Sequence, residues 1–207
     1  MSMYENLTSD FSNRCTKIMN WYYADTIDKE HSITFLLMIA TSAFVIPHEK
    51  LNHSKSPSGK QYSSETGKDI NNSFLKEIAT SDIRYGFLKE INDDPDTWAT
   101  DGTDVGDKKV SEFLSIIRNA LSHGNIYVIE TKPKSNTIGK IAFLSENRKD
   151  SGKCESCKTK QRILNPENPY KFLIFPVDTF QKFLEIWLSF LKNDIDEASK
   201  ILDELGV

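Results

Sequence analysis

The sequence predicts a mainly α-helical protein, a helical bundle with a small antiparallel β insertion before its last long helices. Apolar residues recur at a spacing of three or four along several segments, which is typical of amphipathic helices. Between residues 126 and 176 the spacing shortens towards two, which is typical of strands. The chain has 207 residues, enough to bury a core, and we expect a single domain over residues 1–207.

Two helices are expected near the N-terminus. The first carries apolar residues at helical spacing from Leu7 to Tyr22. The second begins at Asp28, which can serve as its N-cap, and ends at Ile46. We expect Pro47 to stop it, because proline has no N–H to donate within a helix. Apolar residues lie on nearly all its sides, which is typical of a helix in the middle of a bundle.

A long polar loop is expected over residues 47–72, because glycine, proline, serine and lysine occur there without a period. Shorter helices are expected around 74–78 and 83–91. The chain closes with a long helix from Phe180 to Leu191 and a short one over 195–205.

The insertion at 126–176 is expected to contain strands at 126–129, 138–144 and 172–175, with a basic loop before the last strand. Residues 131–171 hold ten Lys or Arg and four Asp or Glu, a balance of +6 that leaves −10 for the rest of the chain. Such a segment can attract phosphate groups, or it can be a solvated loop, and both interpretations stay open. The overall charge of −4 excludes a general nucleic-acid coat protein.

The stretch 110–125 combines an apolar stripe with a polar side. The stripe consists of Val110, Phe113, Leu114, Ile117 and Leu121. Gly124 stands where a helix usually ends, because glycine adopts the left-handed conformation without strain. The other side carries Ser111, Glu112, Ser115, Arg118, Asn119, Ser122 and His123. The small serines would allow a second helix to approach, so this side is a candidate site.

The segment Arg118-Asn-Ala-Leu-Ser-His123 resembles the R-x(4–6)-H signature of HEPN domains (higher eukaryotes and prokaryotes nucleotide-binding). The polar residue after the arginine, the apolar helix before it and the glycine after the histidine strengthen the resemblance. It implies a HEPN-like helical bundle that dimerises and cleaves RNA without metal or cofactor, with paired motifs at the dimer interface. It also implies a toxin or phage-defence role, with an antitoxin or other regulatory partner. The strands at 126–176 depart from the simplest members.

Metal-free RNA cleavage needs an acid, a base and a cation that stabilises the phosphorane. An imidazole titrates near neutral pH, so we expect His123 to act as acid or base. The guanidinium of Arg118 suits phosphate oxygens, and Asn119, one turn from His123, can orient the imidazole or the phosphate. Only one histidine lies near, so the full set requires two protomers or water. The residues expected to bind RNA are Ser122, Lys132, Lys134 and Lys140.

Two other interpretations stay open. Arg118 and His123 can stabilise the helix C-terminus through its dipole, without catalysis. Alternatively, the chain is a non-catalytic HEPN-like dimer that binds nucleotide, RNA or a protein partner. Some HEPN toxins are silenced by modification of a tyrosine two residues after the motif histidine. Asn125 stands there in this chain, which departs from that pattern.

The sequence predicts no bound metal. Cys154 and Cys157 have the spacing of half a zinc site, but a second pair is missing, so we expect reduced thiols in a surface loop. Three cysteines make no disulfide framework, and the N-terminus does not resemble a signal peptide. The longest apolar stretch, 33–46, is too short to span a bilayer. We therefore expect a cytoplasmic protein with no membrane partner.

Overall fold

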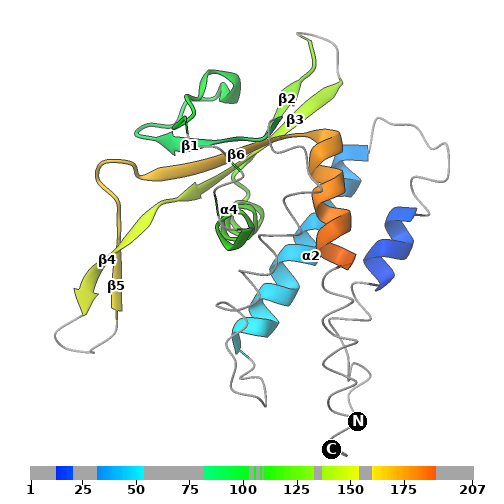
Figure 1. Ribbon diagram of the computed structural model, residues 1–207, viewed down its shortest axis with the longest axis horizontal. Coiled ribbons are helices and arrows are strands. Elements are labelled where there is room, and N and C mark those ends of the chain that lie inside the picture. The colour runs from blue at the N-terminus through cyan, green and yellow to red at the C-terminus, as the bar shows by residue number, and fades with distance from the viewer. Residues whose placement is uncertain are drawn as a thin grey trace, which may run out of the picture. The chain divides into compact units, whose positions relative to one another are not determined.

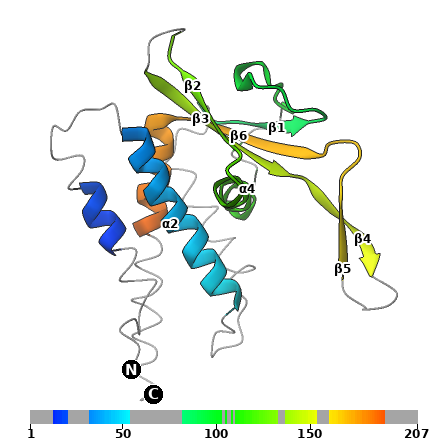
Figure 2. The same cartoon turned by 180° about the vertical axis from the view of Figure 1, so that it is seen from behind.

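The computed structural model describes residues 13–20, 32–53, 82–102, 105, 108, 110–132, 137–153 and 160–189. The chain divides into two compact units. Residues 1–65 and 178–207 form the first, which we call the helical unit, and residues 66–177 form the second, which we call the sheet unit. Figures 1 and 2 show the elements of both units from opposite sides.

The helical unit contains a helix at residues 13–20, α2 (Ser32–His53) and a helix at residues 177–189 that begins at the boundary between the units. Phe44 of α2 stacks on Trp187, with 5.8 Å between the ring centroids, and packs against Phe183 at 5.9 Å. Cys15 is buried, and this burial raises the pKa of its thiol to about 11. The helices predicted at both ends of the chain are thus confirmed where the structure describes them.

The helix α2 continues through Pro47 to His53, so the predicted stop at Pro47 is wrong. A proline inside a helix leaves the carbonyl four residues earlier without its usual N–H donor. Here that carbonyl belongs to Ala43, and it accepts a hydrogen bond from Trp187 Nε1 at 2.9 Å. The indole N–H of Trp187 therefore donates the hydrogen bond that the Ala43 carbonyl would otherwise lack. The remainder of the predicted polar loop, residues 54–72, lies outside the described residues, as do 74–78 and 195–205.

The sheet unit is built on a four-stranded antiparallel sheet with the order β1-β6-β3-β2. Its strands are β1 (Arg84–Leu88), β2 (Ile126–Glu130), β3 (Ile138–Glu146) and β6 (Tyr170–Pro176). The strands β4 (Arg148–Lys153) and β5 (Lys160–Leu164) form a separate antiparallel pair, the β4–β5 hairpin. The hairpin follows β3 and precedes β6 in the sequence, and it extends beyond the ends of these two strands (Figure 1). The prediction of a mainly α-helical bundle is therefore wrong, because a sheet organises this whole unit. Within the described ranges, no helix has the length and apolar character needed to cross a membrane.

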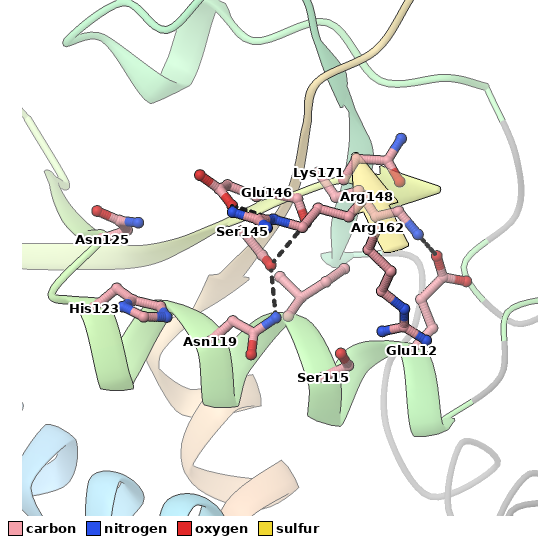
Figure 3. Close-up of a pocket in the computed structure, with 12 residues that line it drawn as sticks. Glu112, Ser115, Asn119, His123, Asn125, Ser145, Glu146, Arg148, Arg162 and Lys171 are labelled. Carbon is pink, nitrogen blue, oxygen red and sulfur yellow. Dashed lines mark hydrogen bonds and ion pairs between the residues drawn. The ribbon is translucent and has the colours of Figure 1, made fainter. Parts of the chain in front are cut away.

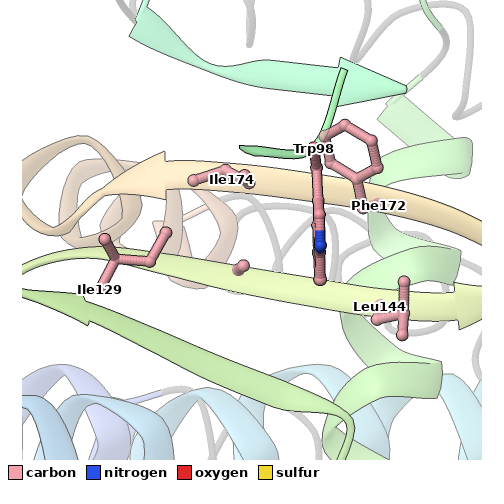
Figure 4. Packing of buried hydrophobic residues seen from close by; sticks show 6 residues of the cluster. Trp98, Ile129, Leu144, Phe172 and Ile174 are labelled. Atoms are coloured by element: carbon pink, nitrogen blue, oxygen red, sulfur yellow. The ribbon is translucent and has the colours of Figure 1, made fainter. Parts of the chain in front are cut away.

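One face of the sheet carries an apolar cluster under Trp98 (Figure 4). The cluster consists of Trp98, Ile129, Ala142, Leu144, Phe172 and Ile174. Trp98 follows the short helix η4 (Pro95–Thr97), and its indole N–H donates to Asn92 Oδ1 at 2.7 Å. A Cβ at Gly86 would lie 2.8 Å from the Phe172 ring, so glycine permits this close packing. The opposite face packs against α4 (Val110–His123), which contacts β3 and β6.

Two further predictions are corrected in the sheet unit. The helix predicted around 83–91 is the strand β1, whose partner β6 is far away in sequence. Pairing with β6 determines its structure, whereas the spacing of Ile83, Phe87 and Ile91 fits a helix. The predicted basic loop forms β4 and β5 around residues 154–159, which lie outside the described residues. The strands predicted at 126–129, 138–144 and 172–175 are confirmed.

Candidate functional site

The C-terminal end of α4 is fixed by its own backbone. Gly124 has φ 72°, in the left-handed region that favours glycine, so the helix ends at His123 as predicted. The Asn125 N–H donates to the Ala120 carbonyl at 2.9 Å, the long bond of a Schellman motif. The exposed imidazole of His123 is thereby placed at a defined helix end.

A pocket of about 920 Å³ runs along one side of α4 (Figure 3). From Glu112 to His123 the helix rises by about 16 Å, at about 1.5 Å per residue. The helix contributes Glu112, Ser115, Ile116, Asn119 and His123 to the lining. Asn125 and the strands facing the helix add Ser145, Glu146, Asn147, Arg148, Arg162 and Lys171. Ile116 is the only apolar residue among them, so the pocket suits a polar or charged ligand.

The Glu112 end of the pocket is lined by paired charges. Tyr85 Oη donates to Glu112 Oε1 at 3.0 Å, and Lys171 Nζ donates to the same oxygen at 2.8 Å. Lys108 Nζ lies 4.4 Å from the centroid of the Tyr85 ring and 3.5 Å from Asp101 Oδ2. These contacts tie α4 to β1 and β6.

The titration of this cluster follows from its surroundings. Burial by itself raises the pKa of Glu112, but the hydrogen bond and charge of Lys171, together with the Tyr85 hydroxyl and Lys108, bring that pKa below its ordinary value. Burial, reinforced by the Glu112 carboxylate, raises the pKa of Tyr85. Glu112 is therefore held as a carboxylate and Tyr85 as a neutral phenol.

In the middle of the pocket, a hydrogen bond joins α4 to β3. Asn119 Nδ2 donates to Ser145 Oγ at 3.0 Å, and Ser145 Oγ lies 3.3 Å from the carbonyl of Glu146. Ser145 is only 4% exposed, so this bond satisfies a buried hydroxyl. Asn119 thus fixes the distance between the helix and the strand on either side of the pocket.

The β4–β5 hairpin brings two arginines to the pocket that the sequence did not identify as site residues. Arg148 Nε and Nη2 each lie 2.7 Å from Glu146 Oε2, and both side chains of this pair are about half exposed. Arg162 lines the pocket from β5 (Figure 3). Their signal in the sequence was the excess of basic residues over 131–171, which gives no positions.

The structure brings together only part of the predicted site. Asn119 and His123 line the pocket, whereas Arg118 is half-buried and Ser122 is exposed, and neither of these lines it. Five residues of helix turn the Arg118 side chain by about 140° from that of His123. Within one protomer the two motif residues therefore point to different sides of α4. The catalytic roles predicted for Arg118, Asn119 and His123 stay predictions.

The predicted RNA-binding lysines do not gather at this pocket. Lys140 shares a sheet face with Ala142 and Leu144, away from α4, and its Nζ lies 2.9 Å from Asp96 Oδ1. Lys132 is exposed just beyond β2. Lys134, Cys154 and Cys157 lie outside the described residues. Among the described residues, no three His, Cys, Asp or Glu side chains are grouped to hold a metal ion.

Comparison with known families adds one finding. Residues 1–198 match the family model described as HEPN pEK499 p136, which confirms the resemblance noted at Arg118 to His123. No curated protein and no solved structure matches the chain.

Proposed function

Because the chain belongs to the HEPN family, in which nucleotide-binding or ribonuclease-like functions are general, we propose that it is a metal-independent endoribonuclease. The cleavage takes place at the His123 end of the pocket. The single observation that carries this proposal is that the motif residues Asn119 and His123 lie in one polar pocket with Arg148, Arg162 and Lys171. These three cations outnumber the two carboxylates of the lining, Glu112 and Glu146, so a polyanionic strand is attracted to the pocket. An imidazole at its end can act as a general acid or base.

The reaction needs no external co-reactant. A base accepts the proton of the ribose 2′-hydroxyl while the 2′-oxygen bonds to the adjacent phosphorus. The bond from phosphorus to the 5′-oxygen breaks, and an acid protonates this leaving oxygen. The products are a 2′,3′-cyclic phosphate and a 5′-hydroxyl. The imidazole of His123 performs one of the two proton transfers, and arginine stabilises the phosphorane through paired N–H groups.

A homodimer completes this site in the proposed mechanism. Arg118 does not line the pocket that holds His123, so a second copy of α4 is needed to bring a motif arginine to the same phosphate. The same symmetry brings a second imidazole for the other proton transfer. The family resemblance supports this arrangement, because paired HEPN motifs meet at dimer interfaces. A toxin or phage-defence role rests on the same resemblance, and growth arrest by the expressed protein, absent with His123→Ala, would test it.

The test of activity uses purified protein with single-stranded and structured RNA in EDTA. We expect cleavage that leaves 2′,3′-cyclic phosphate ends and that slows by about a hundredfold or more in His123→Ala and Arg118→Ala. Mixing these two variants should restore part of the activity if each site draws its arginine and histidine from different protomers. A matched control is Lys89→Ala, an exposed cation outside the pocket, which should cleave as the unaltered protein does. Cleavage by purified His123→Ala at the rate of the unaltered protein would overturn the proposal.

One observation favours a second candidate, a non-catalytic dimer that binds RNA or nucleotide. The pocket of one protomer holds a single imidazole, and the motif arginine lies outside it. In that case the protein would bind RNA without cutting it, and His123→Ala would not change the products. The RNA-end analysis described above separates the two functions.

A further inference from the structure

We propose that the β4–β5 hairpin is an RNA-binding arm. In this arm, Arg148 and Arg162 bind phosphates of the RNA that enters the pocket. This inference rests on the proposed function, because it names how the same pocket holds its polynucleotide. It does not depend on which protomer supplies the motif arginine, nor on whether the RNA is cut.

The register of the hairpin places both arginines on one face. Arg148 pairs with Leu164, and Asp150 pairs with Arg162, so these alternate residues share a face of the two strands. Arg148 and Arg162 both line the pocket, which identifies that face as the one turned towards α4 (Figure 3). Lys149 pairs with the exposed Ile163 on the opposite face, where it does not line the pocket.

The hairpin has the charge that a phosphate backbone requires. The described residues of β4 and β5 contain five cations and one anion, a net charge of +4 in a protein whose total is −4. These residues are Arg148, Lys149, Asp150, Lys153, Lys160 and Arg162. A strongly basic element on an acidic body concentrates anions locally, and its attraction for RNA weakens as salt rises.

Arg148 differs from Lys171, the lysine of the same pocket, in how far its ion pair is exposed to solvent. Lys171 Nζ is bonded to Glu112, and both side chains are largely covered, at 25% and 28% exposure. Arg148 instead pairs with Glu146 where the side chains are 54% and 48% exposed. An exposed ion pair contributes little to stability, so a phosphate can replace the carboxylate at the guanidinium without disturbing the fold. The planar fork of arginine also matches two phosphate oxygens at once.

Binding is measured with a fluorescein-labelled, 2′-O-methyl single-stranded RNA, which cannot be cleaved through its 2′-oxygen. Fluorescence anisotropy at several salt concentrations gives both Kd and its salt dependence. Each phosphate contact contributes about 0.7 to the slope of log K against log salt for single strands. We expect the double variant Arg148→Gln/Arg162→Gln to lower the slope by about 1.4 and to weaken binding at least tenfold at low salt.

The matched control is Lys149→Gln, which removes one positive charge from the opposite face of the same strand. It should change the slope by clearly less than Arg148→Gln alone. Circular dichroism and the thermal midpoint establish that each variant is folded. Should the double variant fail to fold, Arg148→Lys and Arg162→Lys keep the charge but lose the fork, and each should still weaken binding. Equal losses of RNA affinity in Lys149→Gln and Arg148→Gln would overturn the proposed RNA-binding arm. Unchanged RNA binding in the arginine variants would also overturn it.

These outcomes are distinguishable from failure of the proposed function. If the unaltered protein cuts no RNA, but the salt dependence of binding falls in the double variant, the ribonuclease proposal is refuted and the RNA-binding arm is retained. If the protein cuts RNA, but the salt dependence of binding is the same in the unaltered protein and the double variant, the ribonuclease proposal is retained and the RNA-binding arm is refuted. A protein that does not bind the RNA at all would also refute the arm.

Discussion

The two ends of the pocket along α4 differ in how their charges are used. At the Glu112 end, a carboxylate, a phenol and an ammonium group are bonded to one another and largely covered. At the other end, His123 is exposed at a helix terminus, within the same pocket as the half-exposed Arg148. The first arrangement stabilises the packing of α4 on β1 and β6. The second leaves polar groups accessible to a ligand.

One polar side of a helix can therefore serve two purposes, packing against strands at one end and access to a ligand at the other. Glu112 and His123 lie on the same side of α4, yet only the surroundings decide which residue is structural. Asn119 and its bond to Ser145 lie between the two ends. Substitutions at the Glu112 end should therefore affect stability first, and substitutions at the His123 end should affect RNA processing first.

The largest expected effect is on catalysis, at the His123 end of the pocket. Replacing His123 with alanine removes a general acid or base, a group that typically contributes about 10²–10⁴-fold to a rate. The rate of RNA cleavage should fall by that factor while the thermal midpoint stays unchanged, because His123 is exposed. A large drop in the midpoint would instead show that His123 is a structural cap, as the helix-dipole interpretation holds.

The next effect is on stability, at the Glu112 end of the pocket. In Glu112→Ala, the hydroxyl of Tyr85 loses its acceptor and Lys171 loses its counter-ion. An unsatisfied buried polar group costs about 1–3 kcal/mol, so the free energy of unfolding in urea should fall by about this amount. Ser115→Ala, on the same side of the helix but exposed, is the control and should change it by less than about 0.5 kcal/mol.

Tyr85→Phe is a smaller change at the same end of the pocket. The variant deletes one hydrogen bond but keeps the aromatic ring, which packs edge-on against Phe87 at 5.4 Å. Glu112 retains its bond from Lys171, so the loss should be about 0.5–1.5 kcal/mol in urea unfolding. A loss as large as that of Glu112→Ala would mean that the hydroxyl, rather than the whole cluster, holds this end together.

The smallest effect concerns pH. The folded state holds the pKa of Glu112 below its ordinary value of 4.5, so the carboxylate contributes stability above that pH. This contribution is lost as pH falls from 4.5 through the lowered pKa. Glu112→Gln cannot titrate, so the difference in unfolding free energy between it and the unaltered protein should shrink on acidification. A difference that stays constant between neutral pH and pH values well below 4.5 would contradict the assignment.

Local rules predicted α4 correctly, because a helix and its end depend on neighbours in sequence. The spacing from Phe113 to Leu121 and the glycine at 124 suffice to place His123 at a helix terminus. The rule for proline failed in α2, because the donor that replaces the missing N–H comes from Trp187, far along the chain. No local pattern contains that information.

The fold class and the meeting of the two pocket arginines depend on pairing between strands. β1 is a strand because β6 pairs with it, and its own spacing fits a helix equally well. Arg148 and Arg162 meet at one face only through the register of the hairpin. By contrast, the position of Lys140 was within reach of the sequence, because alternation places it on the same face as the apolar Ala142 and Leu144.

In the proposed function, RNA occupies the His123 end of the pocket. Proton NMR can test it through the imidazole Hε1 resonances of the four histidines, with that of His123 assigned by its loss in His123→Ala. On titration with 2′-O-methyl single-stranded RNA, we predict a saturable shift of the His123 resonance that follows the binding curve and weakens in Arg148→Gln/Arg162→Gln. RNA binding that leaves the His123 resonance in place would show that RNA does not occupy this end of the pocket.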